Sequence, residues 1–273
     1  MTIEALRALE TIIARQIPSF QVKFKDESKL MQALGLLMLP FNPTFLTNFT
    51  TTIGSAVYFP SRAQYEGQPD DSVFTLAHEF VHLHDSQEAG LRFQLSYGAP
   101  QILAVPLLVL FSIVGSAFPL FLFLGGYVVF AAICGKRPVV FWSLLAVIAL
   151  AALGLAVLKA GWWTTVLVGA FACLGPWPSP GRTHWEVRGY AMNVALYLWV
   201  RNALVPEGVM TSYIENFTGP DYWFMCRDHN KVEDLFAGVI RSTLERKLQR
   251  EQPYSTIHTF LVEQGRVSAA FRE

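Results

Sequence analysis

Apolar and polar positions in the first third of the chain follow two different periods. Over 2–17 the apolar residues recur at helical spacing, which predicts an amphipathic helix. Over 20–24 they alternate with polar residues, as in a short strand, and the helical spacing returns over 28–39. The run 50–59 is rich in β-branched and aromatic residues and contains Gly54, so it predicts a strand that includes a glycine. This part of the chain therefore predicts helices beside a small sheet.

Three later segments have helical spacing as well. The segment 72–84 starts at a serine that follows two aspartates, and these residue types are favoured at helix N-caps. The segments 183–204 and 231–250 predict two further helices. We therefore expect the C-terminal part of the chain to be mainly helical.

A long apolar block separates these two parts. Over 101–181 the only charged side chains are Lys136, Arg137 and Lys159, and the block contains neither an acidic residue nor a histidine. A helix needs about 20 apolar residues to cross the roughly 30 Å hydrocarbon core of a bilayer, so the block suits two long spans or four shorter ones. We therefore predict a transmembrane helical region over 99–180, which would make this an integral, multi-pass membrane protein in contact with the lipid bilayer.

Composition and charge narrow the classes of function. Hydrophobic residues make up 52% of the chain and charged residues 15%, which fits a membrane region joined to polar parts. The formal net charge is +0, so we expect no binding of nucleic acid. The three cysteines lie far apart and predict free thiols. No signal peptide is recognisable, and Arg182 and Arg188 follow the apolar block, so both polar parts are expected on the cytosolic side.

The candidate chemistry centres on one short motif. His78-Glu79-Phe80-Val81-His82 has the pattern HExxH, and it lies on the helix predicted just before the apolar block. Histidines four residues apart share one helix face and can bind a single Zn²⁺ at about 2.0–2.1 Å. Glu79 would then lie beside the metal and act as the general base that takes a proton from the attacking water. Without a metal, the same three side chains would be ordinary polar residues on a surface helix.

Two histidines leave a catalytic zinc site one protein ligand short, because such sites usually have three ligands and a water. The chain lacks the third histidine that a metzincin carries after HExxH. Asp85 and Glu88 are possible ligands because they follow the motif closely. Glu186, near the start of the first helix after the apolar block, is the stronger candidate, since a carboxylate on a second helix would complete a His₂Glu site. The predicted metal ligands are therefore His78, His82 and Glu186.

The order of these features resembles a known family. An HExxH helix, then an apolar insertion, then a helix with a ligating glutamate is similar to the gluzincin class, in particular to the integral-membrane zinc metallopeptidases that include the prenyl-protein endopeptidases and the heat-shock membrane proteases. The resemblance covers about 50–199 and implies the ligands and the base named above. The chain differs from the family in two places. Tyr190 stands where the family has an acidic residue four positions after the third ligand, and no membrane span is predicted before HExxH.

The resemblance implies a fold that is mainly α with a small β-sheet, namely a zincin-like α+β catalytic domain interrupted by a multi-span helical membrane insertion. The first part of that domain would be 1–98, the transmembrane region 99–180, and the helical part that completes the domain 181–273. We therefore expect a membrane-embedded zinc metallopeptidase with one Zn²⁺ per chain. Its partner would be a protein or peptide substrate, itself membrane-associated, cleaved on the cytosolic side.

Two alternatives belong to other classes of protein. The first is a non-catalytic, multi-span membrane interaction or scaffold protein in which the metal is structural or absent. Glu79 discriminates here, because a structural His₂Glu site needs no glutamate next to its first ligand and water activation does. The second is a protein without membrane spans that buries the apolar block inside an oligomer. A peptidase would also need an oxyanion donor, and Tyr213, Tyr222 and His229 have the right chemistry.

Overall fold

The structure is a computed structural model of the 273-residue chain, and it describes residues 1–38, 42, 44–102, 179–219 and 224–272. The chain divides into two compact units. One consists of Met1–Tyr97 together with Pro178–Glu273, and the other is Gly98–Trp177. The first unit contains nearly all of the described residues, so the elements and the site below are those of this unit.

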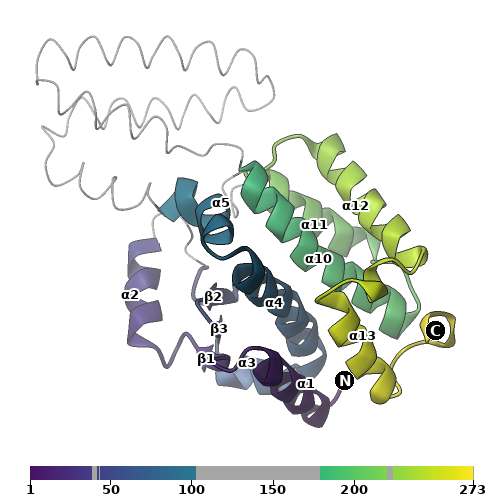
Figure 1. Cartoon of the computed structure of the whole chain (residues 1–273). Helices are drawn as coiled ribbons and strands as arrows, with labels where there is room; N and C mark the ends of the chain where they lie inside the picture. The colour runs from purple at the N-terminus through teal and green to yellow at the C-terminus, as the bar shows by residue number, and fades with distance from the viewer. Residues whose placement is uncertain (39–41, 43, 103–178, 220–223, 273) are drawn as a thin grey trace, which may run out of the picture. The chain divides into compact units, whose positions relative to one another are not determined.

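The first unit is mainly helical and contains one small sheet (Figure 1). The helical elements before the apolar block include three that the sequence predicts, and the C-terminal part is helical as expected. In chain order the elements are α1 (Ile3–Gln16), β1 (Gln21–Phe24), α2 (Lys29–Met38), β2 (Thr51–Ile53), β3 (Ala56–Phe59), α3 (Arg62–Gly67), α4 (Pro69–Ala89), α5 (Leu91–Ile102), α10 (Pro180–Arg201), α11 (Glu207–Thr218), α12 (His229–Leu244), η1 (Leu248–Arg250), α13 (Tyr254–Glu263) and η2 (Ala269–Phe271).

The sheet has three strands in the order β1-β3-β2. β3 lies in the centre, is buried along its whole length, and pairs in parallel with β1 and antiparallel with β2. The single strand predicted over 50–59 is therefore wrong, because this run is a hairpin of two strands. Gly54 makes the turn with a φ of +60°, a left-handed conformation that glycine adopts without steric cost.

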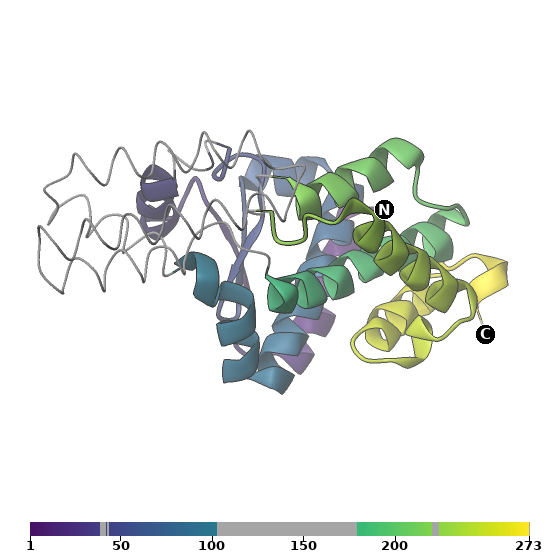
Figure 2. The same cartoon turned by 90° about the horizontal axis from the view of Figure 1, so that it is seen from above.

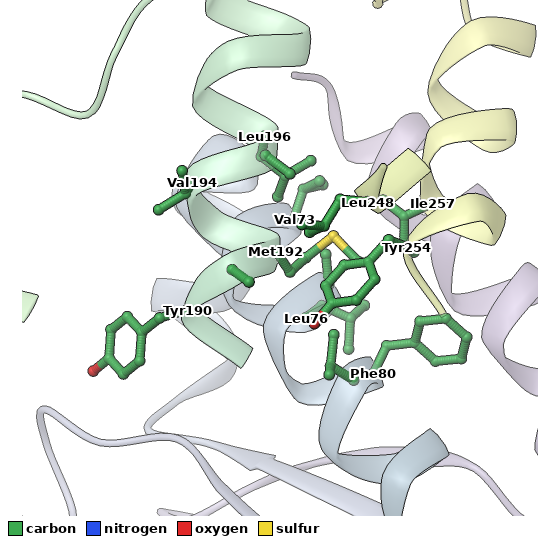
Figure 3. Packing of buried hydrophobic residues seen from close by; sticks show 14 of the residues in the cluster. Val73, Leu76, Phe80, Tyr190, Met192, Val194, Leu196, Leu248, Tyr254 and Ile257 are labelled. Atoms are coloured by element: carbon green, nitrogen blue, oxygen red, sulfur yellow. The ribbon is translucent and has the colours of Figure 1, made fainter. Parts of the chain in front are cut away.

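The core forms where α4 meets α10. Leu76 and Phe80 of α4 and Met192 of α10 are fully buried, and in Figure 3 the side chain of Met192 lies beside Tyr254. α10 packs against α4 on one side and against α12 and α13 on another, so it lies between the N-terminal helices and the C-terminal pair (Figure 2). Burial of α10 on several sides fixes its position relative to α4, and with it the position of any side chain shared between the two helices.

α4 is longer than the segment predicted over 72–84, because it runs from Pro69 to Ala89. Pro69 occupies the first turn, where its missing N–H costs nothing, and Asp70 and Asp71 follow it. Negative charge in the first turn is favourable next to the positive end of the helix dipole. The helix therefore starts on proline and acidic residues, and the expected N-cap residues lie inside it.

Within the described residues, no helix is both long enough and apolar enough to cross a membrane. The two longest, α4 and α10, have 21 and 22 residues, but both carry charged side chains, among them Glu79 and Arg188. This finding contradicts the multi-span membrane insertion of the expected fold class and the expected integral-membrane, multi-pass localisation. That prediction was based on the apolar block 101–181, of which residues 103–178 lie outside the described residues.

Lys25 is a buried charge that the sequence analysis did not single out. It follows β1 directly and is fully buried. Its ammonium nitrogen donates to the backbone oxygen of Phe45 at 2.6 Å and lies 3.8 Å from the centre of the Phe45 ring. Burial lowers the pKa of Lys25 to about 8, and the charge of Glu79 opposes that shift. Lys25 thus ties the turn that precedes β2 to the sheet.

This lysine should give the protein a distinctive pH dependence of stability. Between about pH 8 and about pH 10.5 the unfolded chain keeps a proton on Lys25 that the folded chain has lost, so the free energy of unfolding should rise with pH. We expect a rise of about 1 to 3 kcal/mol relative to Lys25→Met, measured by urea unfolding of the zinc-free protein across this range. Lys23→Met, an exposed control, should follow the wild type. Parallel curves for wild type and Lys25→Met would contradict the expectation.

Candidate metal site

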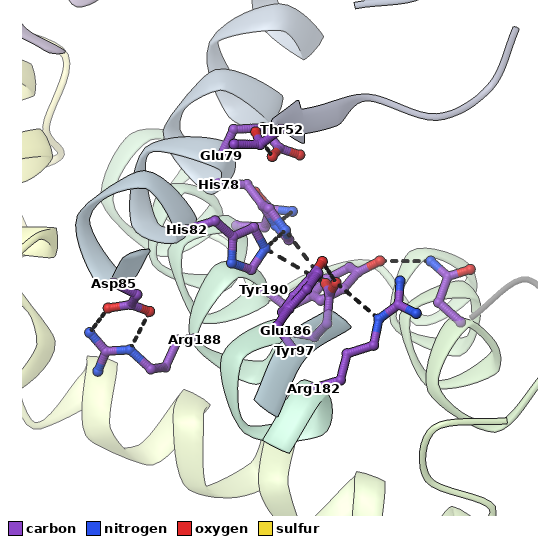
Figure 4. Close-up of polar contacts among 12 residues, drawn as sticks. Thr52, His78, Glu79, His82, Asp85, Tyr97, Arg182, Glu186, Arg188 and Tyr190 are labelled. Atoms are coloured by element: carbon purple, nitrogen blue, oxygen red, sulfur yellow. Dashed lines mark hydrogen bonds and ion pairs between the residues drawn. The ribbon is translucent and has the colours of Figure 1, made fainter. Parts of the chain in front are cut away.

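The three predicted ligands meet in one cluster. His78 and His82 lie one turn apart on α4, and their Nε2 atoms are 3.1 Å from each other. Glu186, in the second turn of α10, places Oε2 at 3.8 Å from each of these Nε2 atoms. The close-up in Figure 4 shows the two rings and the carboxylate converging from the two helices. The structure therefore brings together side chains that are separated in sequence by the whole apolar block.

The surroundings of the cluster match what a bound cation requires. His78, His82 and Glu186 are all buried, and Glu186 is only 1% exposed. Its Oε2 has no hydrogen-bond partner in the part of the chain that the structure describes. A buried carboxylate oxygen without a donor is costly, and a metal ion would supply the missing interaction.

The distances also suit Zn²⁺. Two ligands at about 2.0–2.1 Å around a tetrahedral ion lie about 3.3–3.4 Å apart. The separations in the cluster, 3.1 Å between the imidazoles and 3.8 Å from each imidazole to the carboxylate, are on either side of that value. Two imidazoles and a carboxylate are also a donor set typical of catalytic zinc. The residues present therefore fit the metal that the sequence predicts.

The charges in the cluster favour a cation. Burial, together with neighbouring His82, lowers the pKa of His78 to about 3, so this imidazole is neutral. Burial would also lower the pKa of His82, but the Glu186 carboxylate outweighs it and the pKa of His82 is raised. Burial would raise the pKa of Glu186, and contact with His82 instead lowers it to about 2. The site thus keeps an ionised carboxylate in the interior, where it attracts a proton or a metal ion.

Gly189 allows the two helices to approach each other at the site. A Cβ atom at this position would lie 2.6 Å from Nε2 of His78 and 2.9 Å from Nε2 of His82. Any side chain would therefore occupy the space directly in front of the two imidazole nitrogens. The glycine lies three residues after Glu186 on α10, on the face that meets α4.

Two residues hold the other carboxylate oxygen of Glu186. The Tyr97 hydroxyl of α5 donates a hydrogen bond to Oε1, and Nε of Arg182 lies 3.9 Å from the same oxygen. The Arg182 guanidinium is also stacked 5.2 Å from the Tyr97 ring centre. With Oε1 engaged in this way, Oε2 is the oxygen that faces the histidines. No motif in the sequence indicates Tyr97, because its role arises from the packing of α5 against α10.

Asn193 is placed to orient His78. Its side-chain amide lies 3.3 Å from Nδ1 of His78, on the side of the ring away from Glu186. Half a turn of the amide exchanges its nitrogen and oxygen, and the oxygen would then accept the Nδ1 proton. That arrangement leaves Nε2 of His78 with a free lone pair for a metal. Asn193 lies two helical turns after Glu186, a spacing that places both on one face of α10.

Tyr190, which replaces the family's acidic residue, contacts His78 in a different way. Its ring packs edge-on against the His78 ring, with centres 4.9 Å apart and planes at 90°. Its hydroxyl accepts a hydrogen bond from Asn216 at 2.8 Å. Tyr190 therefore restrains the plane of the His78 ring by packing, while the amide of Asn193 lies against Nδ1.

Glu79 stands outside the set of ligands but next to it. The Thr52 hydroxyl of β2 donates to Oε2 of Glu79 at 2.6 Å. Burial raises the pKa of Glu79, and the Thr52 hydrogen bond and the charge of His82 oppose that rise. Glu79 is thus a largely buried carboxyl group that is held by a hydrogen bond from β2 and lines the neighbouring cleft.

A polar cleft of about 390 Å³ opens beside the cluster. His78 and Glu79 line it from α4, and Thr50, just before β2, lines it from the sheet side. It continues along α4 and α10 past Tyr213 to Arg201 at the end of α10. The candidate base and one candidate ligand therefore face a space that can hold a substrate.

The other candidate residues lie elsewhere. Asp85 receives two hydrogen bonds of 2.8 Å from Arg188, and Glu88 is exposed and near His84, so the structure does not bring either to the His78–His82 pair. Tyr213 lines the cleft, as an oxyanion donor would, and burial raises its pKa to about 12. His229 is half exposed and pairs with Glu233. Tyr222 lies outside the described residues.

Comparisons of the chain with protein-family models, with curated proteins and with solved structures find no match. The resemblance to membrane zinc metallopeptidases, the roles of the four site residues and the identity of the metal therefore stay predictions.

The close approach of α10 to the two imidazoles at Gly189 predicts that a single added methyl group prevents zinc binding. Gly189→Ala should abolish zinc binding and destabilise the protein by about 1 to 3 kcal/mol, because the new Cβ overlaps both imidazole nitrogens. Gly238→Ala on α12 is the matched control. Its Cβ would meet no atom within 4 Å, so it should keep zinc and be neutral or stabilising by up to about 1 kcal/mol. Zinc content by elemental analysis and thermal unfolding test both, and full zinc binding by Gly189→Ala would contradict this geometry.

The hydrogen bond from Tyr97 to Glu186 predicts a smaller loss of zinc affinity when the hydroxyl is removed. Tyr97→Phe keeps the ring that packs on Phe93 but leaves Oε1 of Glu186 without its donor. We expect zinc affinity to fall about 10- to 100-fold, measured by competition with a chromogenic chelator. Tyr58→Phe, remote from the cluster, should bind zinc as the wild type does. Equal affinities for Tyr97→Phe and wild type would show that this hydroxyl does not position the ligand.

Proposed function

We propose that this protein is a zinc-dependent peptide hydrolase in which His78, His82 and Glu186 hold the metal. The observation that supports this most directly is the convergence of an HExxH helix and a second-helix glutamate in one buried cluster beside a polar cleft. Bound there, Zn²⁺ would supply a water whose pKa is lowered from about 15.7 to about 7, and it would polarise the scissile carbonyl.

Glu79 is the residue that favours catalysis over a structural metal. It is buried next to His78, yet it is not one of the three groups that can ligate together, and it lines the cleft. With Oε2 occupied by the Thr52 hydroxyl, Oε1 can accept a proton from the attacking water and pass it to the leaving amine nitrogen. A purely structural site would need neither this carboxyl group nor an adjoining cleft.

The sheet offers a way to hold an extended peptide. β2 is an outer strand, and among the described residues its second edge has no strand partner. The segment that leads into β2 lines the cleft through Asn48 and Thr50, and Thr52 of β2 is hydrogen-bonded to the proposed base. A substrate backbone added to β2 would therefore pass close to Glu79. The Tyr213 hydroxyl, also in the cleft, is a suitable donor to the oxyanion that forms during hydrolysis.

The test combines zinc content with hydrolysis by the full 273-residue chain. Near-stoichiometric zinc is expected in the wild type and in Glu79→Gln, and little in His82→Ala or Glu186→Ala. A proteome-derived peptide mixture, with new termini read by mass spectrometry, should be cleaved by the wild type. Glu79→Gln should lower the rate about 10²- to 10⁴-fold, because the proton acceptor is lost while the metal is kept.

Glu88→Gln, an exposed substitution on the same helix, is the matched control and should behave as the wild type. Zinc bound without hydrolysis of any peptide would mean that the metal is structural. Absence of zinc from folded wild-type protein would overturn the proposal altogether.

A further inference from the structure

One end of the cleft carries a positive charge that the proposed reaction does not use. Arg201 lies in the last turn of α10 and lines the same cleft as His78 and Glu79. Its guanidinium carbon lies 5.0 Å from the ring centre of Phe74 and 4.7 Å from that of Tyr197. The two rings contact each other edge-on, with centres 5.4 Å apart. The guanidinium is thus supported by two aromatic rings at the end of the cleft.

No carboxylate among the described residues lies within 4.0 Å of the Arg201 guanidinium, which is exposed, whereas Arg188 on the same helix is paired with Asp85. Stacking uses the faces of a guanidinium and leaves its N–H groups, which lie in the plane, free to donate. A planar fork of N–H donors matches the two oxygens of a carboxylate. The chemistry at this end of the cleft therefore suits an anionic group of a ligand.

The distance from the candidate metal ligands to Arg201 is about the length of a short, extended peptide. Asn193 contacts His78, and Arg201 lies eight residues further along α10, which corresponds to about 12 Å at 1.5 Å per residue. An extended peptide advances about 3.3 Å per residue, so three or four residues span this length. A peptide whose scissile bond lies at Glu79 would therefore place a residue three or four positions from that bond beside Arg201.

We propose that Arg201 forms an anion subsite, which selects peptides with a carboxylate three or four residues from the scissile bond. This inference rests on the proposed peptidase function, and it adds the class of substrate. The carboxylate can be an aspartate or glutamate side chain or the C-terminus of the peptide. Asp71 also lines the cleft and would weaken the binding of an anion, so Arg201 and Asp71 should act with opposite signs.

Binding can be measured without hydrolysis. The probe is a fluorescently labelled random-peptide pool with a fixed glutamate, compared with a pool that has glutamine at that position, and the protein is Glu79→Gln. We expect the glutamate pool to bind about tenfold more tightly, and this preference should vanish in Arg201→Gln. Asp71→Asn should increase the preference, and Arg241→Gln, an exposed last-turn arginine on α12, should leave it unchanged. Pools ending in a free carboxylate or in an amide distinguish a terminal anion from a side chain.

Hydrolysis supplies the second measurement. Peptides cleaved by the wild type should be enriched in a carboxylate three or four residues from the new terminus, and Arg201→Gln should lose the enrichment while zinc content stays constant. If the wild type cleaves peptides but neither measurement depends on Arg201, the subsite is overturned and the peptidase function stands. If nothing is cleaved but the glutamate preference depends on Arg201, the peptidase function fails and the anion site stands.

Discussion

The close approach of α4 and α10 is the constraint on which the rest of the structure depends. Gly189 lets the backbone of α10 come up to the His78 and His82 imidazoles, and Met192 fills the core beyond it. The two helices run antiparallel, because the Glu186 end of α10 lies at His82 and the Tyr197 end lies at Phe74. One packing interface thus brings the three candidate metal ligands together at one point and forms the walls of the cleft along the rest of its length.

Electrostatics explains why this interface needs more than packing. The three ionisable candidate ligands and Glu79 are all buried, and each charge removed from water is costly unless it is paired. The chain supplies part of the compensation through Tyr97 and Arg182 on one oxygen of Glu186 and through Thr52 on Glu79. Among the described residues, the remaining oxygen of Glu186 has the two imidazoles as its nearest polar neighbours and no hydrogen-bond donor, so a divalent cation would satisfy three groups at once.

The sequence predicts those features that depend on local spacing. His78 and His82 lie within one helix, so their separation of one turn was readable directly, and Glu186 was inferred from the coordination chemistry of zinc. Tyr97, Thr52 and Asn193 could not be found in this way, because helix and strand packing brings them to the site. The hairpin at Gly54 was taken for a single strand, since composition alone does not show where a strand turns back.

The membrane prediction shows the limit of hydrophobicity as a guide. An apolar segment indicates that side chains avoid water, but it does not specify whether lipid or protein surrounds them. The two described helices of membrane-crossing length, α4 and α10, pack against each other and carry charged side chains even where they meet, and none of the described helices can serve as a span.

The division of the cluster between two parts of the chain has a consequence for biosynthesis. His78, Glu79 and His82 are synthesised before the segment 103–178, and Glu186 is synthesised only after it. During that interval the nascent chain contains the two imidazoles and Glu79 but neither Glu186 nor the α10 wall of the cleft. A hydrolase of this layout would stay inactive while it is being translated, and would gain its activity only when α10 packs onto α4.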